Sequence, residues 1–191
     1  GQSTSWAYCM GVRSGRLYPE VWDADATRYA FEAGAVPADG WTHLAMVYTR
    51  NGALVGYVNG IEVGRTDVAD RSVRDTSDEL KLAVDPGGSD HYVDGRIEEV
   101  RVWHVTRTAD ELLDNMHREL TGREDGLSAY YDFNHASGTA LDDRTSDGSS
   151  QADLHNMDDT DWVVSTLPCA ASIAGRLNLR GAWSERPRSL A

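Results

Sequence analysis

Carboxylates gather in two loops of this 191-residue sequence, and they are the first side chains whose spacing suggests chemistry. One group is Asp85, Asp90 and Asp94, around a Pro-Gly-Gly turn; the other is the run DDRTSDG, with Asp142, Asp143 and Asp147. Calcium needs several oxygen ligands, and the carboxylates of the first group, on a rim loop, could hold a calcium ion that bridges to sugar hydroxyls or to a protein ligand. The alternative for both groups is a solvated turn in an Asp-rich chain.

Aromatic side chains offer a second kind of chemistry, because a flat apolar ring can stack on the C–H edges of a sugar. The candidate ligand-binding aromatics are Trp22, Tyr29 and Tyr92. Core packing is the alternative for each of them. We expect Trp6, Trp41 and Trp103 to be buried in the core, because they lie in the strongest strand patterns.

The sequence has no recognisable catalytic motif. It contains no G-x-S-x-G, H-E-x-x-H or P-loop, and its six histidines are scattered. Glu98 and Glu99 are adjacent in a predicted strand, so they point to opposite faces and cannot flank one glycosidic bond. We therefore predict that the protein is not an enzyme.

Composition excludes several partners. The net charge is −13, from 31 acidic and 18 basic residues, which argues against nucleic acid and anionic membranes. No apolar run approaches the ~20 residues of a membrane-spanning helix, so we expect no membrane insertion. The chain begins with Gly1, and we expect a mature product or a fragment. Cys9 and Cys169 either form a disulfide or are unrelated thiols.

The predicted elements are almost all strands. Residues 41–64 contain two Asn-Gly turns between alternating segments, which predicts an antiparallel meander. Pro19 indicates an edge or bulged strand over 16–22. Further strands are expected over residues 5–12, 28–32, 79–84, 92–104, 127–133 and 161–166.

One helix is expected near residues 108–120. Thr108 and Glu111 form a capping box, and the apolar residues that follow have helical spacing. From residue 169 the composition changes, with four Arg and one Glu in the last 23 residues. We expect residues 169–191 to be a basic tail or linker without fixed structure.

The order of four segments resembles the laminin-G-like, concanavalin-A-like jelly-roll domains, above all their bacterial extracellular branch. The segments are WTHLAMVY, GYVNGIEVG, LKLAVD and DGRIEEVRVWHVTRTADEL, and the likeness covers roughly residues 5–120. It implies an all-β, two-sheet antiparallel sandwich with one short helix, in a domain over residues 1–168. Such domains have one or two strands ahead of the part that matches Trp6–Trp22. Either residues 126–166 supply them from the C-terminal end, or the chain is a fragment with an open sheet edge.

The resemblance also implies calcium. Many relatives place an acidic ligand in the last strand, and the matching position here is Glu98, where the usual residue is Asp. Its partners would be Asp142, Asp143 and Asp147, in a loop that resembles the Asp- and Gly-rich loop of the family.

The functional expectation is a non-catalytic recognition or adhesion module, extracellular or on the cell surface, that binds carbohydrate or protein. Other domains of a larger chain are further expected partners. One alternative is a structural spacer in a larger surface protein. A second alternative is a domain like the polysaccharide-active glycoside hydrolases. The resemblance to a fold does not choose among these.

Overall fold

The central meander has the predicted strands, joined by turns at Asn51 and Asn59. Strands β4 (Leu44–Tyr48), β5 (Ala53–Val58) and β6 (Ile61–Asp67) form an antiparallel sheet in the order β4-β5-β6. Both asparagines have positive φ angles, +52° and +51°, which Asn adopts more readily than most residues. The structure is a computed structural model that describes residues 6–84, 93–134, 137–165, 167 and 175–178.

A second antiparallel sheet comes from the N-terminal part of the chain. It has the order β1-β2-β3, with β1 (Tyr8–Arg13), β2 (Arg16–Trp22) and β3 (Arg28–Ala30). Pro19 therefore lies in a central strand whose pairings with β1 and β3 have no register shift, so the expectation of an edge or bulged strand is wrong. Strand β3 ends at Ala30, which pairs with Glu20, so the missing N–H of Pro19 costs no ladder bond on that side.

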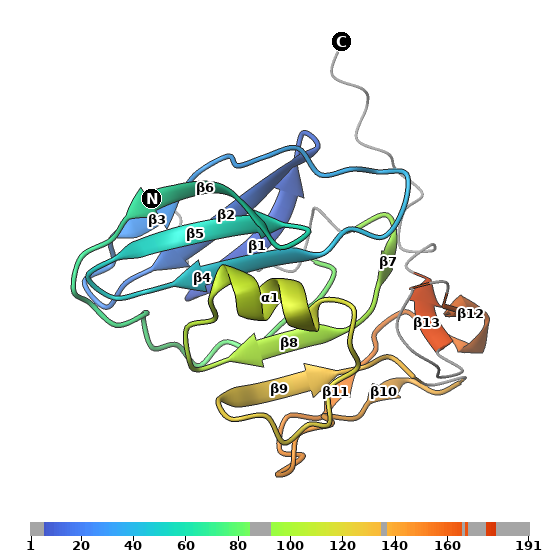
Figure 1. Cartoon of the computed structure of the whole chain (residues 1–191). Coiled ribbons are helices and arrows are strands. Elements are labelled where there is room, and N and C mark those ends of the chain that lie inside the picture. The colour runs from blue at the N-terminus through green and yellow to red at the C-terminus, as the bar shows by residue number, and fades with distance from the viewer. Residues whose placement is uncertain (1–5, 85–92, 135–136, 166, 168–174, 179–191) are drawn as a thin grey trace. The chain divides into compact units, whose positions relative to one another are not determined.

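These two sheets pack face to face and enclose an apolar core (Figure 1). Its most deeply buried residues are Leu17, Val21 and Leu54, which are at most 1% exposed. Helix α1 (Ala109–Asn115) belongs to the same compact unit, which comprises residues 1–80 and 106–118. The predicted capping box between Thr108 and Glu111 is present. Leu112 of this helix packs on Ala53, Val55 and Tyr57, on the face of β5 away from the core.

The second compact unit comprises residues 81–105 and 119–191 and consists of short strands. Antiparallel pairs join β8 (Val100–Trp103) to β9 (Leu127–Tyr131), and β10 (Ala140–Leu141) to β11 (Ala152–Asp153). A further sheet has the order β12-β13-β7, with β12 (Trp162–Val164), β13 (Gly175–Asn178) and β7 (Arg96–Ile97); the 3₁₀ turn η1 (Asp159–Asp161) precedes β12. Its core is built around Tyr131, Phe133, Leu141 and Trp162.

The predicted fold class, all-β with one short α-helix, is confirmed for the described residues, but several boundaries differ. The long strand expected over 92–104 is interrupted at Glu99, which has φ +58° and separates β7 from β8. No strand forms over 79–84, where Ala83 has φ +65°. Within the tail for which we expected a linker, residues 175–178 form β13. The single domain expected over 1–168 stays a prediction.

Candidate binding site

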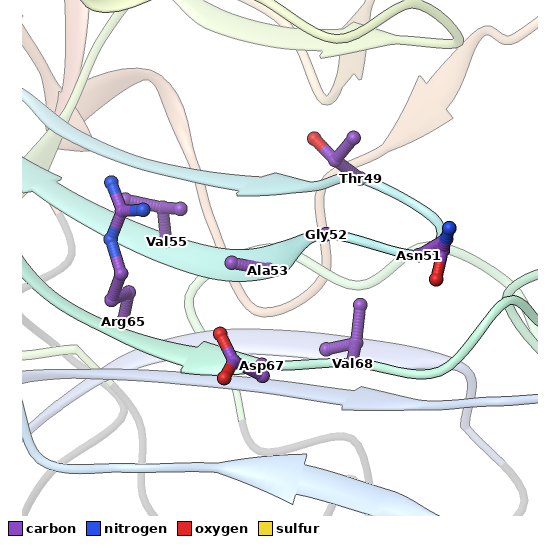
Figure 2. A pocket seen from close by; sticks show the side chains of 8 residues that line it. All are labelled: Thr49, Asn51, Gly52, Ala53, Val55, Arg65, Asp67 and Val68. Carbon is purple, nitrogen blue, oxygen red and sulfur yellow. The ribbon is translucent and has the colours of Figure 1, made fainter.

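A shallow pocket of about 610 Å³ lies on the sheet β4-β5-β6 (Figure 2). It sits at the end of β5 nearest the β4–β5 turn. In α1, Leu113 lies beside Gly60 of the β5–β6 turn, and Leu112 packs against the cluster that includes the pocket residues Ala53 and Val55. All of its lining residues belong to the first compact unit. They are Thr49, Asn51, Gly52, Ala53, Val55, Arg65, Asp67 and Val68.

Strand alternation explains which side chains meet in this pocket. In β5, Leu54 is fully buried in the core between the two sheets, so Ala53 and Val55 point to the outward face. Directly paired residues of an antiparallel sheet share a face. Asp67 is paired with Ala53 and Arg65 with Val55, so both polar residues lie beside the apolar floor.

The charged side of the pocket is held in place by an ion pair. Arg65 donates two hydrogen bonds to Glu62, each 2.6 Å long, from Nε to Oε1 and from Nη2 to Oε2. The hydrogen bond to Arg65 lowers the pKa of Glu62, and the same bond, followed by the charges of Glu62 and Asp67, raises the pKa of Arg65. The guanidinium is therefore charged, oriented and compensated, and the pocket carries no excess positive charge.

The remaining polar groups keep their hydrogen-bonding capacity. In the described part of the chain, no side-chain hydrogen bond joins Thr49, Asn51 or Asp67 to another residue, and all three are exposed. Together they present a hydroxyl, an amide and a carboxylate around Ala53 and Val55, which are themselves 8% and 7% exposed. This combination can bind a small molecule that has both hydroxyl groups and apolar C–H surface.

Catalysis is not favoured by the lining of the pocket. Asp67 is the one carboxylate among the eight lining residues, and neighbouring Glu62 is engaged by Arg65. Glycoside hydrolysis needs two carboxylates that flank the scissile bond. The arrangement therefore suits recognition better than bond cleavage.

Of the three aromatic candidates, Trp22 lies on the outward face of β1-β2-β3. Its Nε1 donates to Glu20 Oε1 at 2.9 Å, and Trp6 donates to the same oxygen at 3.1 Å, so Trp6 also has a role outside the core. Tyr29 instead packs against the buried cluster of Val21 and Leu54, and its hydroxyl donates to Asp23 at 3.1 Å. Tyr92 lies outside the described residues.

The first carboxylate loop offers one described residue. Asp94 is exposed, while Asp85 and Asp90 lie outside the described part of the chain. Asp94 lies in the second compact unit, and Trp22 and Tyr29 lie in the first. The ligand-binding role of these candidates stays a prediction.

The four predicted calcium ligands each have other partners. Asp143 is nearly buried and accepts hydrogen bonds from the backbone N–H groups of Tyr130, Thr145 and Ser150. Asp147 accepts from Thr145 and Ser149, which lower its pKa, and Asp142 accepts from Gln151 at 3.0 Å. Glu98 accepts from the hydroxyl of Ser165 at 2.6 Å.

Among the described residues, no three His, Cys, Asp or Glu side chains are grouped so that they could hold a metal ion. The predicted ligand set therefore does not fit calcium, because a hard cation needs several oxygens that converge on one point. Asp143 organises its own loop instead. Calcium binding stays a prediction, without a described ligand set to support it.

The sequence analysis did not single out the residues that line the pocket. A usable signal was present, because the two Asn-Gly turns fix the register and place Asp67 and Arg65 opposite Ala53 and Val55. What the sequence did not show is that α1 packs against the same face of β5, where Leu112 joins the cluster of Ala53, Val55 and Tyr57.

Comparison with known protein families identifies the fold family. Residues 1–113 match the family model Laminin_G_3, which describes the concanavalin A-like lectin/glucanases superfamily. The chain belongs to this superfamily. The resemblance noted in the sequence is thereby confirmed, and the pocket lies within the matched residues.

A solved structure has a similar fold. It is the 1.50 Å crystal structure of a presumed carbohydrate-binding protein from Bacteroides ovatus ATCC 8483, with a TM-score of 0.52 and 20% sequence identity. The match covers 80% of this chain and 50% of that protein, so the chain spans about half of its length. No curated protein matches the chain significantly. Among the described residues no helix is both long and apolar enough to span a membrane.

Proposed function

We propose that this superfamily member is a non-catalytic carbohydrate-binding module, and that the pocket lined by Thr49, Asn51, Arg65 and Asp67 is its sugar site. The observation that carries the proposal is a group of three exposed polar side chains that have no hydrogen-bond partner among the described residues, beside a small apolar floor whose two residues are 7–8% exposed. A sugar ring matches it, because hydroxyl groups surround a C–H surface. The proposal includes an extracellular or cell-surface location, where polysaccharides and glycans occur.

Two further facts support the same ligand class. The superfamily is named for lectins and glucanases, both of which bind saccharides. The Bacteroides ovatus structure is of a presumed carbohydrate-binding protein. Since Arg65 is already compensated by Glu62 and Asp67, the pocket suits a neutral sugar better than an anionic one.

The test is calorimetric titration with four neutral hexasaccharides: cellohexaose, laminarihexaose, mannohexaose and xylohexaose. The variant Thr49→Val/Asp67→Asn removes one hydroxyl and one charge from the rim with little change in shape. Losing one neutral and one charge-assisted hydrogen bond costs about 2–4 kcal/mol, which weakens binding by about thirtyfold or more.

The matched control is Asp70→Asn. Asp70 is an exposed carboxylate near the same hairpin end, pairs with Arg50 at 3.0 Å and does not line the pocket. We expect the control to bind like the wild type. The proposal fails if none of the four sugars binds at millimolar concentration, or if the pocket variant and the control bind equally well.

A further inference from the structure

The outward face of the sheet β1-β2-β3 carries arginines and aromatic rings in alternate positions. This face lies on the other side of the sandwich from the pocket, because the inward faces of the two sheets enclose the core. Its side chains follow from the strand register. They are Cys9 and Arg13 of β1, Arg16, Tyr18, Glu20 and Trp22 of β2, and Arg28 of β3.

Two of these arginines face each other across the β1–β2 hairpin. Arg13 is paired directly with Arg16, on either side of the turn formed by Ser14 (φ +50°) and Gly15 (φ +71°). Both are exposed, and neither has an ion pair with an acidic residue in the described part of the chain. Like charges directly opposite in a sheet are destabilising. A chain with 31 acidic residues therefore keeps an uncompensated pair of cations at this hairpin.

The neighbouring side chains are fixed by mutual contacts. The guanidinium carbon of Arg13 lies 3.9 Å from the centre of the Tyr18 ring. Arg28 Nη2 donates to the Tyr18 hydroxyl at 2.7 Å and to Glu20 Oε2 at 2.6 Å. The bonds from Trp6 and Trp22 to Glu20 complete the network. Rings and guanidinium groups are thus held in position before a ligand arrives, which lowers the entropy cost of binding.

The acidic groups on this face do not cancel its positive charge. Glu20 is 6% exposed, and its two oxygens already accept three hydrogen bonds, one of them from Arg28. Glu32 is exposed just beyond the end of β3, and the register extends to place it beside Tyr18. Three arginines therefore face two carboxylates, and the arginine pair at the hairpin has neither carboxylate as an ion-pair partner.

We propose that this face binds an acidic saccharide whose carboxylate groups are held by Arg13 and Arg16 and one of whose rings stacks on Trp22. Guanidinium groups bind carboxylates through paired N–H donors, and an indole ring offers a flat surface to C–H groups. Arg16 and Trp22 are six positions apart in one strand, which corresponds to roughly 20 Å, so the ligand is an extended oligosaccharide. This site is separate from the pocket and does not depend on it.

The test compares hexagalacturonate with two probes, the neutral cellohexaose and a single-stranded thymidine hexanucleotide. The variant is Arg13→Gln/Arg16→Gln. Its control is Arg50→Gln/Arg71→Gln, which removes the same charge from exposed arginines that pair with Asp70 and Asp25. We expect hexagalacturonate to bind the wild type and the control, to weaken as salt rises, and to bind the variant at least tenfold less tightly.

Unfolding measurements show whether the variant is folded. Removing two opposed like charges should leave its stability equal to or above that of the wild type. The pocket variant Thr49→Val/Asp67→Asn should bind hexagalacturonate normally, which separates this inference from the proposed function. A sulfated hexasaccharide that binds more tightly than hexagalacturonate would overturn the carboxylate assignment. The inference is also overturned if the hexanucleotide binds as tightly as hexagalacturonate, or if Arg13→Gln/Arg16→Gln weakens cellohexaose binding as much as hexagalacturonate binding. Equal binding of hexagalacturonate by the variant and the control would overturn it as well.

Discussion

The indole N–H of Trp22 donates to Glu20 across 2.9 Å, so the ring that the sequence offered for stacking is anchored to a nearly buried carboxylate. Burial alone would raise the pKa of Glu20. The hydrogen bonds from Arg28, Trp22 and Trp6 outweigh burial, and they hold this pKa below its ordinary value. Glu20 is therefore charged at neutral pH and fixes two indole rings.

This relationship predicts a pH-dependent contribution to stability. A carboxyl whose pKa is lower in the folded state stabilises the fold above its unfolded pKa of about 4.3, and the contribution disappears as pH falls through the folded value. Glu20→Gln should lower the free energy of unfolding by about 1–3 kcal/mol at pH 7. The two proteins should converge in stability at acidic pH. A difference that is the same at pH 7 and below the folded pKa would contradict this role of the charge.

Gly60 lies beside Leu113 of α1, so a side chain at this position should disturb the packing of the helix. It has φ +76°, and an added Cβ would lie 2.9 Å from Leu113 Cδ1 and 3.3 Å from its Cα. Gly60→Ala should therefore destabilise the protein through backbone strain and through displacement of α1. Gly15→Ala is the control, because Gly15 has φ +71° with no atom near the added Cβ. Urea unfolding should show a larger loss for Gly60→Ala; equal losses would mean that α1 does not pack on this turn.

The carboxylate of Asp143 should stabilise its loop, because it accepts hydrogen bonds from three backbone N–H groups. Asp143→Ala would leave three backbone N–H groups without their acceptor, at a cost of about 1–3 kcal/mol for each one that stays buried and unsatisfied. We expect a large fall in the melting temperature of this variant, equal in calcium and in chelator. Asp142 is the exposed residue next to Asp143, and Asp142→Ala should change stability little. A calcium-dependent rise in the wild type that is lost in Asp143→Ala would restore the metal site predicted from the sequence.

The meander and the capping box could be predicted from sequence because both depend on local rules. Asn-Gly turns fix the strand pairs of β4, β5 and β6, and Thr108 with Glu111 fixes the start of α1. The break at Glu99 could not be predicted, because a positive φ is uncommon for Glu and no Gly or Asn marks the position. The sequence predicted a ligand role for Asp143. In the structure its carboxylate instead anchors the loop, because the fold brings backbone N–H groups to it.

The predicted functional residues divide in the same way. Trp22 points to the outward face of the sheet β1-β2-β3 and is half-buried, as a stacking residue requires. Tyr29 points to the opposite, inward face of the same sheet and packs against the core. The pocket was not predicted because its lining comes from strands β5 and β6 and from the segments that adjoin them. Neither Thr49 nor Asp67 belongs to a motif.

Thr108 caps helix α1 and should contribute to the stability of the helix. Its side chain accepts the backbone N–H of Glu111 at 3.2 Å, and Glu111 accepts the N–H of Thr108 at 2.8 Å. Thr108→Ala should cost about 1 kcal/mol in urea unfolding, whereas Thr108→Ser keeps the acceptor and should cost little. Equal costs for both variants would show that the cap bond does not matter.

The most direct test of the account is amide chemical-shift mapping of the labelled protein during titration with the neutral hexasaccharide that gives the strongest calorimetric signal. We predict saturable shifts that centre on residues 49–55 and 65–68 and that vanish in Thr49→Val/Asp67→Asn. Shifts elsewhere on the protein, with none in these two segments at saturation, would contradict the assignment of the pocket as the sugar site.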